Sequence, residues 1–153
     1  MGTDQMTPYE IVETYRDDIL ILLRYLPWLE ERSGKKVAVS YNQNDIGANS
    51  ISFPVYDGTL LQFVREARAT SFMNINYRYG LLRYRLKESK DEIAFIPTAT
   101  IQQMNILGDI LSKYVLGGQT KGRLWSQAMD EGIFLDVVAK MKELLDFWTA
   151  TNN

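Results

Sequence analysis

Cysteine and histidine are both absent from this chain of 153 residues. Without cysteine there can be no disulfide bond, thiolate nucleophile, iron–sulfur cluster or cysteine-type zinc site. Without histidine there is no serine–histidine dyad, imidazole base, histidine-ligated metal or histidine pH switch. Only carboxylate, lysine, arginine and tyrosine chemistry is left. We therefore expect a protein that is not an enzyme and that holds no cofactor and no metal.

Long apolar runs are also absent. A membrane-spanning helix needs about 20 apolar residues, and the densest apolar stretch, Ile19 to Leu29, is interrupted by Arg24 and Pro27. The first residues, Met1 to Gln5, are polar and acidic, unlike the basic and apolar regions of a signal peptide. These features predict a cytoplasmic protein that does not bind a membrane.

The composition is typical of one ordinary domain. Hydrophobic residues make up 46% of the chain and charged residues 24%, and the formal net charge is −2. A chain of this length buries roughly 68–70% of the surface that its unfolded form exposes. No repeat, low-complexity tract or linker divides the sequence. We expect a single helical domain over residues 7–150, and we interpret residues 1–6 as a cloning remnant or a disordered start.

Most of the sequence has helical spacing. Thr7, Pro8 and Glu10 form a capping-box start, and apolar residues then recur every three or four positions until Pro27, which should end or kink the helix near Tyr25. Further helices are predicted over residues 57–71, around 79–86, and over 100–115, 120–131 and 133–148. The expected fold is mainly α, a compact bundle of four to six helices with a minor antiparallel β hairpin.

The hairpin is expected between residues 33 and 57. Large apolar residues alternate with smaller or polar ones on both sides of a turn-rich stretch, Asn42 to Asn49; they are Val37, Val39 and Tyr41 before it and Ile51, Phe53 and Val55 after it. This pattern is typical of two strands joined by a long loop, and Pro54 favours an edge position. A short apolar segment, Ile93 to Ile96, is interpreted as a third strand.

Several patterns resemble catalytic or binding motifs but lack the context that the chemistry needs. A helix, not a strand, precedes the glycine-rich loop Gly117 to Gly122, which excludes a phosphate loop. A calcium loop starting at Asn42 would place Phe53 where a bidentate carboxylate is required. Ser33, in a serine–lysine spacing, ends a helix instead of starting one. Neighbouring acids such as Asp17 and Asp18 diverge by about 100° on a helix and do not converge locally.

Tyrosine and arginine concentrate in residues 76–90, where five basic residues accompany one acid, Glu88. Arginine pairs with carboxylates and phosphates, and tyrosine offers a stacking plane. Three interpretations remain open: ordinary packing of long side chains on the core, a protein partner, or nucleic acid. The candidate partner-binding residues are Tyr77, Arg78, Tyr79, Arg83, Tyr84 and Arg85, with the loop Asn42 to Asn49 as a further contact.

The second half of the chain also carries a recognisable order of segments. These are Ile110 to Val115, the glycines Gly117 and Gly118, Leu124 to Ala128 and Asp130 to Phe134, preceded by Pro54 to Asp57, Phe63 and Asn76-Tyr77. From about Leu20 to Leu145 the sequence resembles a family of small bacterial proteins of unknown function that are often encoded on mobile elements. The family usually has an Arg-Phe pair where this chain has Gln119, Thr120 and Lys121. The resemblance implies a shared fold and no activity.

We therefore expect a small, non-catalytic interaction or accessory protein of the bacterial cytoplasm. It would bind a macromolecular partner through the Tyr/Arg segment, with arginine charge pairing around tyrosine anchors. A protein partner is favoured over nucleic acid because the net charge is acidic. A nucleic-acid-binding module is the alternative.

Overall fold

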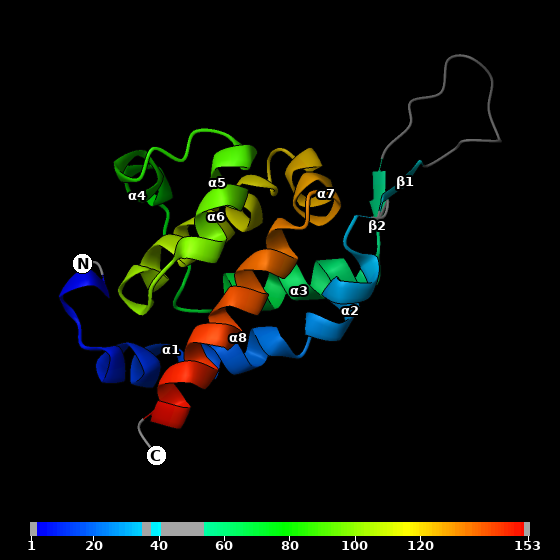
Figure 1. The fold of residues 1–153 in the computed structure, drawn as a ribbon. Coiled ribbons are helices and arrows are strands. Elements are labelled where there is room, and N and C mark those ends of the chain that lie inside the picture. The colour runs from blue at the N-terminus through cyan, green and yellow to red at the C-terminus, as the bar shows by residue number, and fades with distance from the viewer. Residues whose placement is uncertain (1–2, 35–37, 41–53, 152–153) are drawn as a thin grey trace, which may run out of the picture.

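Helices build the protein. The computed structural model describes residues 3–34, 38–40 and 54–151. These residues form eight α-helices: α1 (Pro8–Leu23), α2 (Leu26–Arg32), α3 (Gly58–Arg68), α4 (Tyr77–Arg83), α5 (Ser89–Phe95), α6 (Met104–Gly117), α7 (Arg123–Asp130) and α8 (Ile133–Thr151). Three 3₁₀ helices accompany them: η1 (Thr3–Gln5), η2 (Ile96–Thr98) and η3 (Ile101–Gln103). Figure 1 shows the helices gathered into one bundle.

The mainly α bundle agrees with the sequence, but four to six helices were too few for the described residues. Pro27 divides the first helical region, because it lies in the first turn of α2 where its missing N–H group costs nothing. The interpretation of Ile93 to Ile96 as a strand was wrong, since these residues belong to α5 and η2. Asp91 Oδ2 accepts hydrogen bonds from the backbone N–H groups of Lys87 (3.1 Å) and Glu88 (3.0 Å) at the start of α5. A short apolar run does not distinguish a buried strand from a buried helix.

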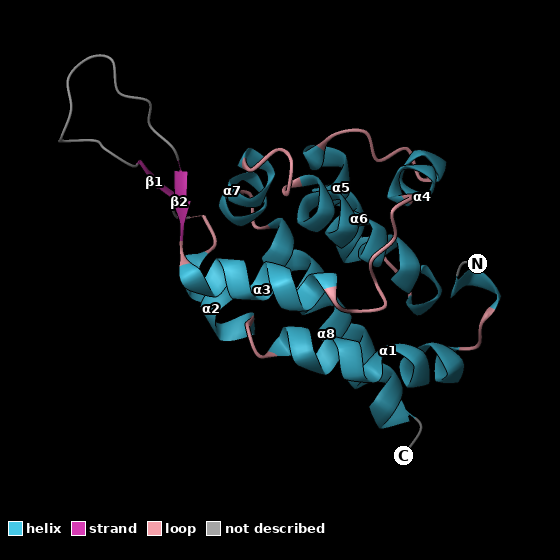
Figure 2. Ribbon diagram, turned by 180° about the vertical axis from the view of Figure 1, so that it is seen from behind, coloured by secondary structure: helices cyan, strands magenta, loops and turns pink. Residues whose placement is uncertain are grey.

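Two three-residue strands, β1 (Ala38–Ser40) and β2 (Pro54–Tyr56), pair antiparallel with Val39 opposite Val55. They lie beside α2 and α3 at one edge of the bundle (Figure 2). The rest of the predicted hairpin, including the loop Asn42 to Asn49, is outside the described residues. The hairpin with the arms expected from the sequence therefore stays a prediction.

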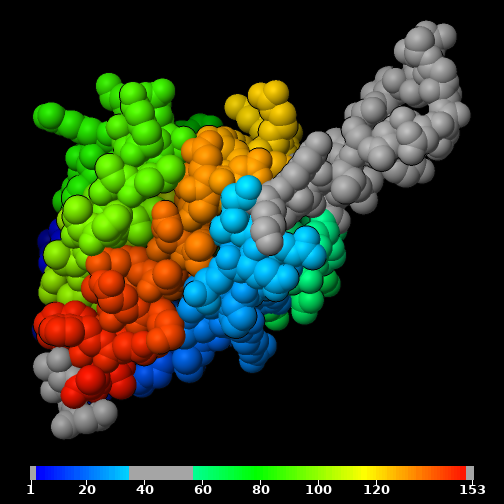
Figure 3. Space-filling model, turned by 45° about the vertical axis from the view of Figure 1, so that its right-hand side comes forward, coloured from blue at the N-terminus to red at the C-terminus, as the bar shows by residue number. Residues whose placement is uncertain are grey.

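The core is organised around α6 and α8. Ten of the fourteen residues of α6 are buried, as is typical of a helix that is covered on all sides. Helix α6 packs against α3, α4, α7 and α8, while α8 packs against α1, α2 and α6. Figure 3 shows α8 as an orange-to-red band between the blue N-terminal helices and the green middle of the chain. Among the described residues, none of the helices combines the length and apolar character needed to cross a membrane.

Residues 3–6 pack against the domain, although the sequence analysis placed the domain's start at residue 7. Thr3, in η1, is only 1% exposed. Its hydroxyl donates to the Gln102 carbonyl (2.5 Å) and accepts from the Asn105 backbone N–H (3.2 Å). Met6 packs against the core cluster. Residues 3–6 are therefore ordered by contacts with η3 and α6 that are about one hundred positions away in sequence, which local patterns could not reveal.

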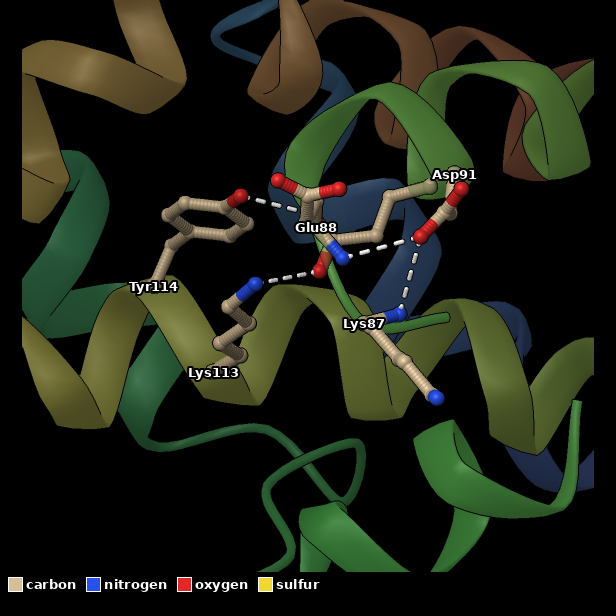
Figure 4. A network of polar contacts seen from close by, with 6 residues as sticks. Lys87, Glu88, Asp91, Lys113 and Tyr114 are labelled. Atoms are coloured by element: carbon tan, nitrogen blue, oxygen red, sulfur yellow. Dashed lines mark hydrogen bonds and ion pairs between the residues drawn. The ribbon is translucent and has the colours of Figure 1, made fainter. Parts of the chain in front are cut away.

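A charged group lies completely buried between α5 and α6. The Glu92 side chain is 0% exposed, and its carboxylate accepts hydrogen bonds from Lys113 Nζ (2.5 Å) and Tyr114 Oη (2.6 Å). Figure 4 labels Lys113 and Tyr114 on α6 and draws the hydrogen bond of each side chain as a dashed line. Burial and the bond to Glu92 raise the pKa of the Tyr114 hydroxyl, which keeps it a donor. Both carboxylate oxygens are thus satisfied, as a buried charge requires.

Substitution of Lys113 tests this arrangement. We expect Lys113→Met to lower the free energy of unfolding by about 3–5 kcal/mol, because Glu92 would remain buried without its cation. The double variant Glu92→Met/Lys113→Met should recover most of this loss, since it removes both charges together. Urea unfolding at neutral pH measures both values. A double variant as unstable as the single one would contradict the pairing.

Candidate functional site

The Tyr/Arg segment folds into α4, the turn after it and the start of α5. Helix α4 lies at the edge of the bundle against α6 (Figure 1). Gly80 makes this packing possible: a Cβ atom at this position would come within 2.0 Å of Asp109 Oδ2 and within 3.3 Å of Ile106 Cδ1. Leu81 is buried next to it. One face of α4 is therefore committed to α6, and the opposite face is left for solvent or a partner.

The outer face of α4 and the turn before it carry an apolar ridge, which we define as Ile75, Tyr79 and Leu82. They are 85%, 75% and 62% exposed and are the three most exposed large hydrophobic side chains among the described residues. Tyr79 and Leu82 are three positions apart and lie along one side of α4, and Ile75 lies in the turn just before the helix. Exposed apolar side chains are ordinary when scattered, but a contiguous group marks an interaction surface.

Arginines surround the ridge. Arg78, Arg83 and Arg85 are all exposed. The Arg78 guanidinium lies 5.7 Å from the centre of the Tyr77 ring, a cation–π distance. Arg83 Nη2 lies 3.6 Å from Asp4 Oδ2, an exposed ion pair that contributes little to stability. The guanidinium groups therefore remain accessible.

The six candidate residues of the sequence analysis divide into two groups. Tyr79 and the three arginines reach solvent, whereas Tyr77 and Tyr84 are half-buried and pack against the core. The Tyr84 ring lies 5.5 Å from that of Phe95. Ile75 and Leu82 were missed, although the helical spacing of Leu82 to Tyr79 was a readable signal. The loop Asn42 to Asn49 lies outside the described residues.

Arg85 has an unusual backbone conformation. Its φ is +60°, in the left-handed region that favours glycine. It follows α4 in a Schellman motif, in which the Leu86 N–H donates to the Leu81 carbonyl (2.8 Å) and the Arg85 N–H to the Leu82 carbonyl (3.0 Å). Leu81 and Leu86 are both buried. Arginine occupies the position where glycine would be more stable, and such strain often accompanies function.

A polar cavity of about 410 Å³ lies on one side of α4, between it and α6, with Asn74, Tyr79, Gly80, Arg83 and Asp109 among its lining residues. Asp109 is 4% exposed. Its Oδ1 accepts from Asn74 Nδ2 (2.9 Å). Burial raises the pKa of Asp109 to about 6, and the bond from Asn74 opposes this shift. The cavity therefore contains one carboxyl group that titrates near neutral pH.

Among the described residues, no three carboxylates gather where they could hold a metal ion.

Comparison with protein-family models, with curated proteins and with solved structures finds no match to this chain. Function is therefore inferred from the geometry of α4 and its surroundings.

The Asp109 carboxyl predicts a pH-dependent stability. The folded state holds the Asp109 proton up to about pH 6, whereas the unfolded chain releases it near pH 4. Folded Asp109 thus binds more protons in this window, and its contribution to the free energy of unfolding falls as the pH rises. We expect Asp109→Asn to be more stable than the wild type by ~1–3 kcal/mol above pH 7 and to lose this advantage at pH 4. Urea unfolding at the two pH values measures the difference, and an advantage independent of pH would contradict the assignment.

The strain at Arg85 predicts a stabilising substitution. Arg85→Gly should raise the free energy of unfolding by ~1 kcal/mol, because glycine adopts positive φ without a steric penalty. The melting temperature would rise by about 2–4 °C. Gly132, which also has a positive φ (+75°) and has no atom near its Cβ position, provides the reciprocal control. Gly132→Ala should lower the stability by a similar amount, and a destabilised Arg85→Gly variant would contradict the conformational argument.

Proposed function

We propose that this protein is a small, non-catalytic interaction module that binds a protein partner through the outer face of α4. The observation that carries the proposal is the ridge of Ile75, Tyr79 and Leu82, whose exposure is the highest of any large hydrophobic group described. Together these side chains form an apolar centre. The arginines Arg78, Arg83 and Arg85 form its polar rim.

The arrangement matches the energetics of protein interfaces. Such interfaces have an apolar centre and a polar rim, and tyrosine and arginine are enriched among the residues that contribute most to affinity. The short α4 is held from behind by Gly80 and Leu81, so its outer face is presented on a fixed support. A rigid surface loses little conformational entropy on binding.

Two features favour a protein partner over nucleic acid, one of the ridge and one of the whole chain. Ile75 and Leu82 are aliphatic and offer no plane on which a base could stack. The chain as a whole is slightly acidic, which disfavours nonspecific attraction to phosphates. Tyr79 and the arginines alone are compatible with both partners, so the aliphatic residues decide between them.

The ridge double variant Tyr79→Ser/Leu82→Ser tests the proposal. We expect it to retain its helical circular dichroism and to lose the proteins that the wild type retains from a bacterial lysate, including after nuclease treatment. The matched control is Tyr9→Ser/Leu20→Ser on α1, where the same residue types are 59% and 49% exposed. The control should retain the same proteins as the wild type, with quantification by mass spectrometry.

Two outcomes would overturn the proposal. Equal retention by the ridge variant and the wild type would show that the ridge does not bind the partner. Loss of all retained material on nuclease treatment would instead assign α4 to nucleic acid.

A further inference from the structure

An open groove lies on the other side of α4 from the Asp109 cavity. Its volume is about 420 Å³, and its floor includes Leu81, Leu86 and Leu124. Leu82, which belongs to the exposed ridge, also lines it. The groove is therefore continuous with the surface that we assign to a protein partner.

The rim of this groove is cationic. Arg78, Lys87, Lys113 and Lys121 line it, and no acidic residue does. Lys113 is paired with Glu92 at 2.5 Å. Arg78, Lys87 and Lys121 are exposed, and none of the seven ion pairs found between described residues includes them. Because the chain has a net charge of −2, this local excess of positive charge is not a general property of its surface.

The chemistry of the groove defines its occupant. Leucine side chains on the floor would bury one or two aliphatic or aromatic side chains of a partner. Three cations that take part in none of these ion pairs would pair with carboxylates on either side of that anchor, since complementary charge guides and orients association. A nucleic acid would meet the charges but would place phosphates or bases against leucines.

We infer that the groove binds an acidic segment of the protein partner, in which aspartate or glutamate flanks a leucine-sized anchor. This inference rests on the proposed function and adds the chemical class of the partner. Lys113 links the groove to the fold, because the residue whose ammonium group neutralises buried Glu92 also lines the groove.

A selection experiment tests the inference without a known partner. Random linear peptides displayed on phage are selected against the full chain, and the enriched peptides are measured by fluorescence anisotropy. We expect enriched sequences in which acidic residues flank leucine, isoleucine or phenylalanine. Their affinity should fall about tenfold or more for Arg78→Glu/Lys121→Glu. The matched control is Arg65→Glu/Arg68→Glu on α3, where both arginines are exposed; its affinity should stay close to that of the wild type.

The possible failures are distinguishable. Enriched peptides without acidic residues that lose binding on Tyr79→Ser would overturn the acidic groove and leave the ridge as the partner surface. Enriched peptides indifferent to both Tyr79→Ser and the groove variant would overturn both proposals. If the groove variant and the α3 control lost the same amount of peptide affinity, the loss would be an effect of overall charge, and the inference would be overturned. The inference would also be overturned if no peptide were enriched over an unrelated bait. Displacement of the enriched peptides by a single-stranded oligonucleotide, or by the fatty acid oleate, would overturn it too.

Discussion

The complete burial of the Glu92 carboxylate is the constraint on which the arrangement of α4, α5 and α6 depends. A buried carboxylate is tolerable only when its charge and hydrogen-bonding capacity are met. Lys113 and Tyr114 meet both, and they therefore hold α5 against α6. Ser112 and Asp109, on the same side of α6, bond to the backbone and side chain of Asn74 just before α4. Four polar positions of one helix thus orient both short helices packed beside it.

This support explains how α4 can exist at all. A helix of seven residues is too short to be stable alone in water. Packing at Gly80 holds it in its middle, and the turn that buries Leu81 and Leu86 holds its C-terminal end. Because stability comes from these contacts, the outer face is free to carry residues that do not help folding. Exposed Ile75 and Leu82 and strained Arg85 are what an interaction surface would retain despite a cost in stability.

Local signals in the sequence were most informative where the physical cause was local. The capping box of Thr7 and Glu10 starts α1 as expected, and Asp57 caps α3 through the Thr59 N–H. The segment Ile93 to Ile96 was misassigned because its conformation depends on Asp91 and on Glu92, whose burial requires a partner on α6. The order of residues 3–6 likewise depends on a distant contact, since Thr3 is held by Gln102 and Asn105.

The absence of cysteine and histidine, the helical class and the position of the Tyr/Arg segment could all be read from the chain, because composition, caps and periodicity act over a few residues. Which tyrosines are exposed could not. Tyr77, Tyr79 and Tyr84 are equivalent as residue types, and only the packing of α4 on α6 turns the first and last inward and leaves Tyr79 in solvent. The cationic groove likewise exists only because folding brings Arg78, Lys113 and Lys121 from three separate segments to one apolar floor. Such convergence is a property of tertiary contacts, and no spacing within the sequence encodes it by itself.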